Sequence, residues 1–278
     1  MLANLQQSAL TPPTAPIPLT SASPHASHAP DPARNLARVT IAGFDLRLHP
    51  SGAVYLPSHS TWLIADAHFG KATSFRRWGV PVPSGTTQTM LAQLTALTQS
   101  QATQQFIFLG DFLHSAQAQN PSVQSALSAW RAQRPELQLT LVRGNHDQHA
   151  GDPPPELNMT VVDEPLLLMS EPSPATGLSR LALCHHPQAV DGAYVLAGHW
   201  HPCVSVSGKA GDRLRLPCFW FGDEAASQPA SAVGVLPAFG AFTGMHPIDR
   251  MPGDRVFAIA GEVIRELPAL TAWRGDRC

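Results

Sequence analysis

Short apolar runs alternate with polar clusters through the first two thirds of the chain. Five of these runs end abruptly in polar residues, at positions 62–65, 106–109, 139–142, 181–183 and 194–197. Runs of this length, rich in aliphatic and aromatic residues, are typical of buried β-strands. The pattern therefore predicts five strands whose C-terminal ends hold a site.

Segments with apolar residues at helical spacing lie between the first three of these strands. One helix is predicted from near Ser84, with an apolar face that runs to Leu97. Another is predicted from Pro121, with Leu127 and Trp130 on one face. Further strands are predicted at residues 39–42, 45–48, 53–56, 161–162, 166–169, 214–216, 232–236 and 256–259. Helices alternate with strands in the first half and strands dominate the second, which indicates an α/β fold of two facing sheets with helices outside.

The N-terminal segment has a different composition from the rest of the chain. Residues 1–35 are rich in proline, alanine, serine and threonine, and no Asp, Glu, Lys or Arg precedes Asp31. Such a segment buries too little apolar surface to offset its ordering entropy. We expect a disordered extension at 1–35, or a misassigned start codon, followed by one folded domain at 36–278.

Composition and charge limit the kinds of protein to which this chain can belong. A hydrophobic fraction of 44% is ample for a sizeable core, and the formal charge of −2 provides no global attraction to nucleic acid or anionic lipid. The four cysteines form no CxxC pair, which favours reduced thiols and a cytoplasmic protein. No apolar run approaches the roughly 20 residues that span a bilayer, and the N-terminus lacks the features of a secretion signal.

The polar residues that follow the strands are those that bind divalent metal ions. The candidate ligands are Asp66, His68, Asp111, Asn145, His185, His199 and His201. They mix oxygen and nitrogen donors without thiolate, which suits manganese, iron or zinc. Taken singly, Asp66 also fits a helix cap, and His68 or His114 a hydrogen-bonded core histidine. Their joint occurrence, each after an apolar run, favours one metal site.

Local spacing adds two expectations about the backbone. Glycine directly precedes Asp111, Asn145 and His199, although Gly-Asp and Gly-Asn pairs are also common in ordinary turns. A strand that turns sharply at a metal needs a positive φ or a close backbone approach, and glycine allows both. On a continuing strand, the spacing of two between Asp66 and His68 would place both side chains on one face.

Read in order, the clusters form D-x-H, GD-x-x-H, GNH-D, a single His and GH-x-H, all between residues 66 and 201. This order resembles the calcineurin-like metallophosphoesterase superfamily. Further stretches are similar to the bacterial ligase-associated DNA damage response endonucleases called PdeM, at residues 66–71, 76–77, 81–86, 213–220 and 236–244. The resemblance implies a four-layer α/β/β/α sandwich of two facing mixed sheets flanked by helices.

The resemblance also implies two divalent metal ions, with manganese preferred over iron or zinc. One metal would be held by Asp66, His68, Asp111 and His201. The other would be held by Asp111, Asn145, His185 and His199. Either histidine of the doublet His185-His186 fits the ligand position. We choose His185, because the family's histidine stands directly after the strand, and expect His186 to lie behind the ligands or to face the substrate.

Two metals of this kind clamp the attacking and departing oxygens of a phosphoryl displacement, with a metal-activated hydroxide as nucleophile. His146 is expected to protonate the leaving oxygen or to stabilise the phosphorane, because the neighbour of a ligand such as Asn145 diverges from the metal. Asp147 is a candidate to orient the imidazole of His146. His114 occupies the position of a substrate-facing histidine in the family.

Basic residues suggest how a phosphate chain would bind. Alternation along the strand would send Arg143 either toward the metal mouth, where it could grip a phosphate, or to the opposite end of the pleat. Lys71, Arg76 and Arg77 are expected to track a nucleic-acid backbone beside aromatic residues such as Trp78. The same group also fits a solvated helix face.

The leading hypothesis is a phosphodiesterase that cleaves DNA as an endonuclease in a ligase-associated repair pathway, in functional association with a DNA ligase and a helicase. A hydrolase of small nucleotides or pyrophosphate-linked metabolites is the second hypothesis, since the fold alone does not separate the two. A non-catalytic scaffold is the third.

Overall fold

The computed structural model describes residues 36–116, 120–173, 177–207, 211–223 and 232–270. All of the described residues belong to one compact unit. The disordered extension predicted at residues 1–35 lies outside the described residues. The domain boundary at residue 36 therefore stays a prediction.

The first sheet has seven strands, which lie side by side in chain order. They are β1 (Ala37–Ile41), β2 (Phe44–Leu48), β3 (Val54–Leu56), β4 (Thr61–Ala65), β5 (Gln105–Leu109), β6 (Gln138–Val142) and β7 (Met159–Val162). Strands β1 to β4 pair antiparallel, and β4 to β7 pair parallel. All five residues of β4 are buried, as expected of a central strand that is covered on both faces.

The second sheet has nine strands, in the order β14-β11-β12-β13-β10-β9-β8, with β15 paired to β12 and β16 paired to β15. They are β8 (Leu166–Met169), β9 (Arg180–Leu183), β10 (Tyr194–Ala197), β11 (Pro202–Ser207), β12 (Arg213–Phe221), β13 (Val233–Val235), β14 (His246–Pro247), β15 (Arg255–Ala260) and β16 (Val263–Glu266). Strands β9, β10 and β13 are parallel, and most other pairs are antiparallel. Both sheets are therefore mixed.

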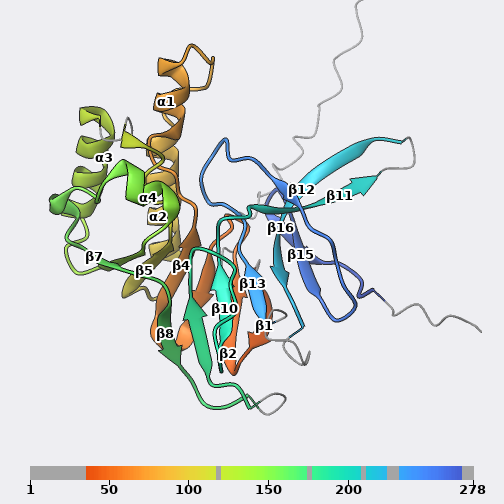
Figure 1. Ribbon diagram of the computed structural model, residues 1–278. Coiled ribbons are helices and arrows are strands. Elements are labelled where there is room, and N and C mark those ends of the chain that lie inside the picture. The colour runs from red at the N-terminus through yellow and green to blue at the C-terminus, as the bar shows by residue number, and fades with distance from the viewer. Residues whose placement is uncertain (1–35, 117–119, 174–176, 208–210, 224–231, 271–278) are drawn as a thin grey trace, which may run out of the picture. The chain divides into compact units, whose positions relative to one another are not determined.

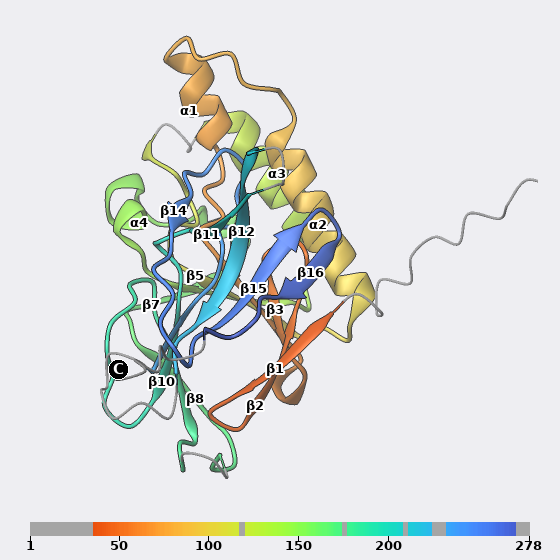
Figure 2. The ribbon, with the colours of Figure 1, turned by 90° about the vertical axis from the view of Figure 1, so that its right-hand side faces the viewer.

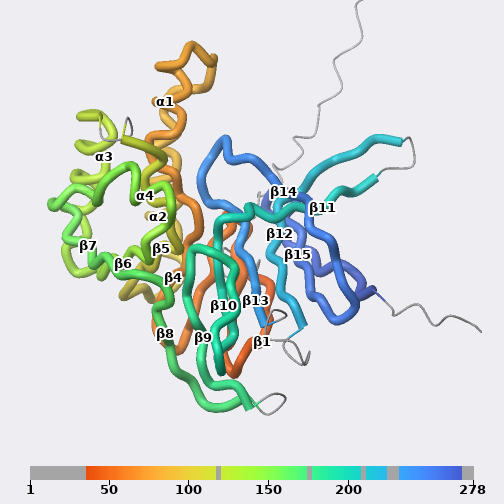
Figure 3. Tube along the Cα trace, viewed as in Figure 1, coloured from red at the N-terminus to blue at the C-terminus, as the bar shows by residue number. Residues whose placement is uncertain are grey.

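The two sheets face each other across a shared core (Figures 1 and 3). Leu63 and Ile107 of the first sheet join Leu196, Phe219 and Phe257 of the second in one buried cluster. The predicted α/β fold with two facing mixed sheets is confirmed.

Helices cover the other face of the first sheet. The α-helices are α1 (Lys71–Arg77), α2 (Thr86–Ser100), α3 (Pro121–Ala132) and α4 (Asn145–Ala150), and the short 3-10 helices are η1 (Pro57–His59) and η3 (Pro155–Leu157). Leu94 of α2 and Leu127 of α3 pack with Phe106 of β5 in a second buried cluster. The ribbon shows α2 and α3 beside the strands of this sheet (Figure 1). In the described ranges all α-helices lie between residues 71 and 150. These ranges therefore contain no helical layer on the outer face of the second sheet, where one was expected. None of the described helices has the length and hydrophobicity needed to span a bilayer.

The parallel strands of both sheets end at one edge, and backbone hydrogen bonds tie the loops that follow them. The amide of His68 donates to the carbonyl of Asp111 at 2.8 Å, which joins the loops after β4 and β5. The amide of Gly198 donates to the carbonyl of His185 at 3.1 Å, which joins the loops after β9 and β10. The amide of His199 donates to Oδ2 of Asp66 at 2.8 Å and thereby links the two sheets.

Candidate metal centre

The five polar clusters predicted from the sequence meet at this edge. Three sets of their side chains are close enough to hold a metal ion, each with ligand atoms within 4.8 Å of one another. These sets are Asp66, His68 and His201; Asp66, Asp111 and His185; and His185, His186 and His199. The carboxylates of Asp66 and Asp111 are almost fully buried, so both charges are enclosed within the protein.

The backbone at this edge is left-handed at five of the predicted ligands. The φ angles are 52° at Asp66, 47° at His68, 50° at Asp111, 70° at His199 and 48° at His201. A non-glycine residue in this region costs roughly 1–2 kcal/mol, and such strain concentrates at functional sites. The expectation that a continuing strand places Asp66 and His68 on one face is wrong, because β4 ends at Ala65 and a tight turn follows.

All three glycines that precede ligands meet the predicted backbone requirement. Gly110 has a φ of +74°, and a Cβ there would lie 2.1 Å from Nδ1 of His185. A Cβ would lie 2.5 Å from Oδ1 of Asp111 on Gly144, and 2.5 Å from Oδ2 of Asp66 on Gly198. Any larger residue at these positions would displace a predicted ligand.

On one side of the centre, two atoms that accept hydrogen bonds face each other. Nδ1 of His201 lies 3.0 Å from the carbonyl oxygen of Gly244, so the ring proton resides on Nδ1 and Nε2 carries a lone pair. This Nε2 lies 3.5 Å from Oδ1 of Asp66, and both atoms are buried without a hydrogen-bond partner. Nε2 of His68 lies 3.8 Å from Oδ2 of Asp111. Acceptors arranged in this way need a cation between them.

On the other side, His185 shows the same arrangement. Its Nδ1 donates to the carbonyl of Leu109 at 3.1 Å, which leaves a lone pair on Nε2. That nitrogen faces Oδ1 of Asn145 at 2.8 Å, Nδ1 of His199 at 3.0 Å and Oδ1 of Asp111 at 3.5 Å. An imidazole lone pair directed at an amide oxygen and a carboxylate fits a bound divalent metal.

Electrostatics at the site also favours cations. Burial raises the pKa of Asp111, and the charge of Asp66 raises it further. Burial lowers the pKa of His68, of His185 and of His199. Neutral imidazoles and closely placed carboxylates together form the donor set that a divalent first-row metal stabilises.

His146 extends into the centre from the start of α4. Its Nδ1 lies 2.8 Å from the carbonyl oxygen of His114 and its Nε2 lies 3.9 Å from Oδ2 of Asp111. The ring of His114 stacks on that of His146, with centroids 5.2 Å apart, and burial lowers the pKa of His114 to about 4. The carbonyl of His114 thus occupies the position predicted for Asp147, whose carboxylate instead accepts the amides of Gly144 at 3.0 Å and Leu113 at 3.2 Å.

The predicted substrate-binding residues divide into two groups. Lys71 lies near the centre: burial lowers its pKa, while Asp111 and Asp66 raise it. Arg76 and Arg77 are exposed on α1, which in both ribbon views stands at the end of the domain opposite the β1–β2 hairpin (Figures 1 and 2).

Arg143 pairs with two acidic residues of neighbouring loops. Its Nη1 donates to Oδ1 of Asp152 at 2.6 Å, and its Nε lies 4.0 Å from Oδ1 of Asp163. The phosphate grip expected of Arg143 stays a prediction, in which a phosphate would compete with these two carboxylates for the guanidinium.

One acidic residue at this edge was missed in the sequence. Glu164 follows β7, and its carboxylate accepts hydrogen bonds from the amides of His185 and His186 and from Nδ1 of His186. The sequence pattern could have identified Glu164, because residues 159–164 are another apolar run that ends in acidic residues.

Comparison with known proteins gives the family. No protein-family model and no curated protein matches the chain. Among solved structures, the Pseudomonas putida nuclease MPE is 37% identical, with a TM-score of 0.68, and the match covers 84% of this chain and 100% of that one. The chain belongs to the metallophosphoesterase family. This metallophosphoesterase is accordingly a hydrolase of phosphate esters, as the order of its polar clusters predicted.

Two more distant structures also match this metallophosphoesterase. The Escherichia coli phosphoesterase Yfce is 11% identical with a TM-score of 0.35, and the match covers 74% of this chain and 97% of that one. A predicted phosphoesterase from Streptococcus pneumoniae is 10% identical with a TM-score of 0.28, and the match covers 74% and 95% of the two chains.

Proposed function

We propose that this metallophosphoesterase is a nuclease that hydrolyses phosphodiester bonds of DNA with two divalent metal ions. The observation that carries the proposal is the set of acceptor atoms without partners, Oδ1 of Asp66 and Nε2 of His201 among them, that converge at one edge of both sheets. Its similarity to the Pseudomonas putida nuclease supports a nucleic-acid substrate.

The ligand sets follow the two sides of the centre. Asp66, His68, Asp111 and His201 would hold one metal, and Asp111, Asn145, His185 and His199 the other. Asp111 can serve both, since its Oδ2 faces His68 and its Oδ1 faces His185. When bound, the metals supply Lewis acidity that activates water and neutralises charge on the phosphoryl group. The donor set fits manganese, iron or zinc, and manganese remains our first expectation.

The protein's own residues position the proton that the leaving oxygen needs. Because Nδ1 of His146 is held by the carbonyl of His114, Nε2 is directed toward Oδ2 of Asp111, where it would meet a phosphate bound at the centre. The amide of His146 also donates to Oδ1 of Asp111 at 2.9 Å, which fixes the base of the side chain. We assign proton donation to His146 and the positioning of its ring to His114. Asp147 holds the loops after β5 and β6.

Aromatic and basic side chains around the centre support binding of a nucleic acid. Trp200 stands between His199 and His201, is exposed, and stacks on Trp220 with centroids 5.8 Å apart. Nε1 of Trp220 donates to Oδ2 of Asp254 at 2.9 Å and holds the pair in place. An exposed, braced indole offers a face on which a base can stack, and Lys71 supplies a nearby positive charge.

The biological setting remains part of the proposal. A role in DNA repair together with a DNA ligase and a helicase extends the resemblance seen in the sequence. A cytoplasmic location is consistent with the three free cysteines of the described residues, at positions 184, 203 and 218.

The experiment that tests this function compares Asp111→Asn with Asp191→Asn, an exposed carboxylate on the β9–β10 connection. The asparagine can still accept the amide of His146, so the fold is retained while the bridging charge is lost. Cleavage of a DNA oligonucleotide in manganese should fall by about a thousandfold or more in Asp111→Asn, because several kcal/mol of charge stabilisation are lost. Undiminished cleavage by Asp111→Asn would refute the role of Asp111. Equal turnover of a dinucleotide and an oligonucleotide by the wild type would favour a small nucleotide as substrate.

A further inference from the structure

Glu164 holds the loop after β9 by three hydrogen bonds. Its Oε2 accepts the amides of His185 at 2.7 Å and His186 at 2.9 Å. Its Oε1 lies 2.8 Å from Nδ1 of His186. Glu164 itself lies between β7 and β8, where the chain passes from the first sheet to the second. The orientation of both histidines therefore depends on a carboxylate outside the predicted ligand set.

The bond to Glu164 determines which nitrogen of His186 is available. A carboxylate oxygen only accepts, so the ring proton of the neutral imidazole resides on Nδ1. Nε2 then keeps a lone pair. Histidines that bind metals almost always donate their other ring N–H to a carboxylate or a carbonyl, and His186 has this arrangement.

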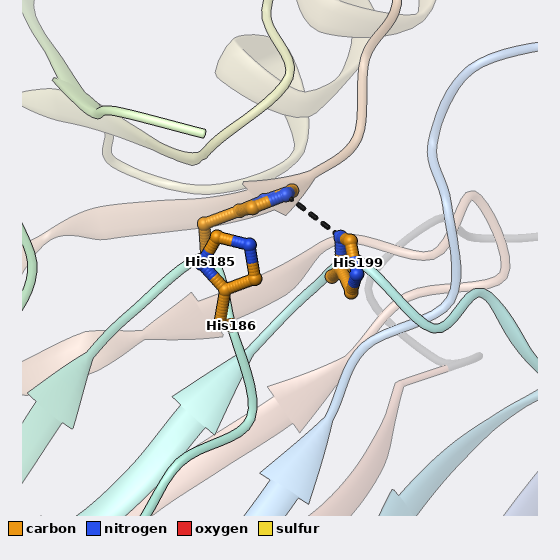
Figure 4. Close-up of side chains that lie close together, drawn as sticks. All are labelled: His185, His186 and His199. Carbon is orange, nitrogen blue, oxygen red and sulfur yellow. Dashed lines mark hydrogen bonds between the residues drawn. The ribbon is translucent and has the colours of Figure 1, made fainter. Parts of the chain in front are cut away.

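The ring of His186 lies against two predicted ligands (Figure 4). Its centroid is 4.6 Å from that of His185 and 4.7 Å from that of His199. One ring nitrogen of each of the three residues lies within 4.8 Å of the other two. Nitrogens bound to one metal at about 2.1 Å lie at most about 4.2 Å apart, so a small movement of the rings brings all three onto one ion.

We propose that His186 is a third imidazole ligand of the metal held by His185 and His199, and that Glu164 positions it for this role. Both histidines of the doublet, His185 and His186, are then metal ligands. This inference rests on the proposed function in assuming a metal at this side of the centre. It adds a ligand, and a positioning carboxylate, to the set that the family pattern supplies.

The first test removes the ligand. His186→Gln is compared with wild type and with His59→Gln, a histidine on η1 away from the centre, by calorimetric titration of metal-free protein with Mn²⁺. Wild type and His59→Gln should bind two equivalents. In His186→Gln one equivalent should bind about 10–100-fold more weakly while the other is unchanged.

The second test changes the tautomer of His186 without removing the ring. In Glu164→Gln the single amide oxygen can serve the two backbone amides, and the amide NH₂ then faces Nδ1 of His186. The ring proton moves to Nε2, which can no longer bind a metal. Glu164→Gln should therefore weaken the same equivalent as His186→Gln, whereas Glu171→Gln, on an exposed segment, should titrate as wild type.

The outcomes separate this inference from the proposed function. Two tight equivalents in His186→Gln, together with slower DNA cleavage, would overturn the inference and place His186 against the substrate while leaving the metal centre intact. Absence of manganese binding by the wild type would overturn both. In the Co²⁺-loaded protein, paramagnetic NMR should show one fewer shifted imidazole N–H signal in His186→Gln than in wild type, and an unchanged number would contradict a ligand role.

Discussion

Removal of metal should destabilise the protein by an amount that can be worked from the acceptor atoms at the centre. Oδ1 of Asp66 and Nε2 of His201 are buried, 3.5 Å apart, and have no hydrogen-bond partner. Each such atom costs about 1–3 kcal/mol when left unsatisfied. An ion between them removes this cost in the folded state only, so metal binding should raise the free energy of unfolding.

The size of the effect follows from mass action. At a free Mn²⁺ concentration of about 100 times Kd, one occupied site raises the free energy of unfolding by about 2.7 kcal/mol. For a domain of about 150–250 residues, 1 kcal/mol shifts Tm by about 2–4 °C, so the expected shift is about 5–11 °C. His201→Gln removes one ligand. If affinity falls tenfold, the same Mn²⁺ concentration adds only about 1.4 kcal/mol, or about 3–6 °C.

The assay is thermal unfolding of wild type, His201→Gln and the control His59→Gln, each in excess chelator and in titrated Mn²⁺. Wild type and His59→Gln should share one large metal-dependent shift, and His201→Gln should show a smaller one. Identical Tm values for chelated and Mn²⁺-loaded wild type would refute the reasoning, because the facing acceptors would then not bind a cation. Equal shifts in His201→Gln and wild type would remove His201 from the ligand set.

Three further predictions test the backbone, the pH response and the substrate. Gly144→Ala should lower kcat about a hundredfold with little change in the fold, because its Cβ would lie 2.5 Å from Oδ1 of Asp111 and displace that carboxylate; normal kcat would show that the loop adapts. Burial lowers the pKa of His49 to about 4, below the 6.5 of the unfolded chain, so its contribution to stability is complete above pH 6.5 and is lost as the pH falls toward 4. The control variant is His49→Asn, whose amide oxygen can still accept the amide of Ser51. Between pH 7 and pH 5 the free energy of unfolding, measured by urea denaturation, should fall by about 1–2 kcal/mol more in wild type than in His49→Asn; an equal fall in both would contradict this. Trp200→Ala should raise KM for a DNA oligonucleotide between about fivefold and a hundredfold, and by less for a chromogenic diester, because a stacked base contributes about 1–3 kcal/mol; equal effects on both would argue against stacking.

Most elements of the fold were predictable because local pattern reflects burial. The fully apolar run of β4 and the helical spacing of α2 and α3 specify elements that are covered on particular faces, and the structure has them within a few residues. The α2 helix begins at Thr86 rather than near Ser84. The helical layer expected over the second sheet could not be decided in this way, because periodicity describes an element and not which sheet it covers.

At the metal centre, the sequence by itself determined which residues end the parallel strands, and thus which acids and imidazoles can meet. Only the tertiary structure decided their partners. The carbonyl of His114, rather than Asp147, holds His146, and Arg143 donates a hydrogen bond to Asp152. Glu164 reaches the histidines after β9 from the segment that joins the two sheets. The physical reason is that a strand end is encoded by its own neighbours in the chain, whereas a hydrogen bond between loops of two sheets depends on where long-range packing brings those loops together.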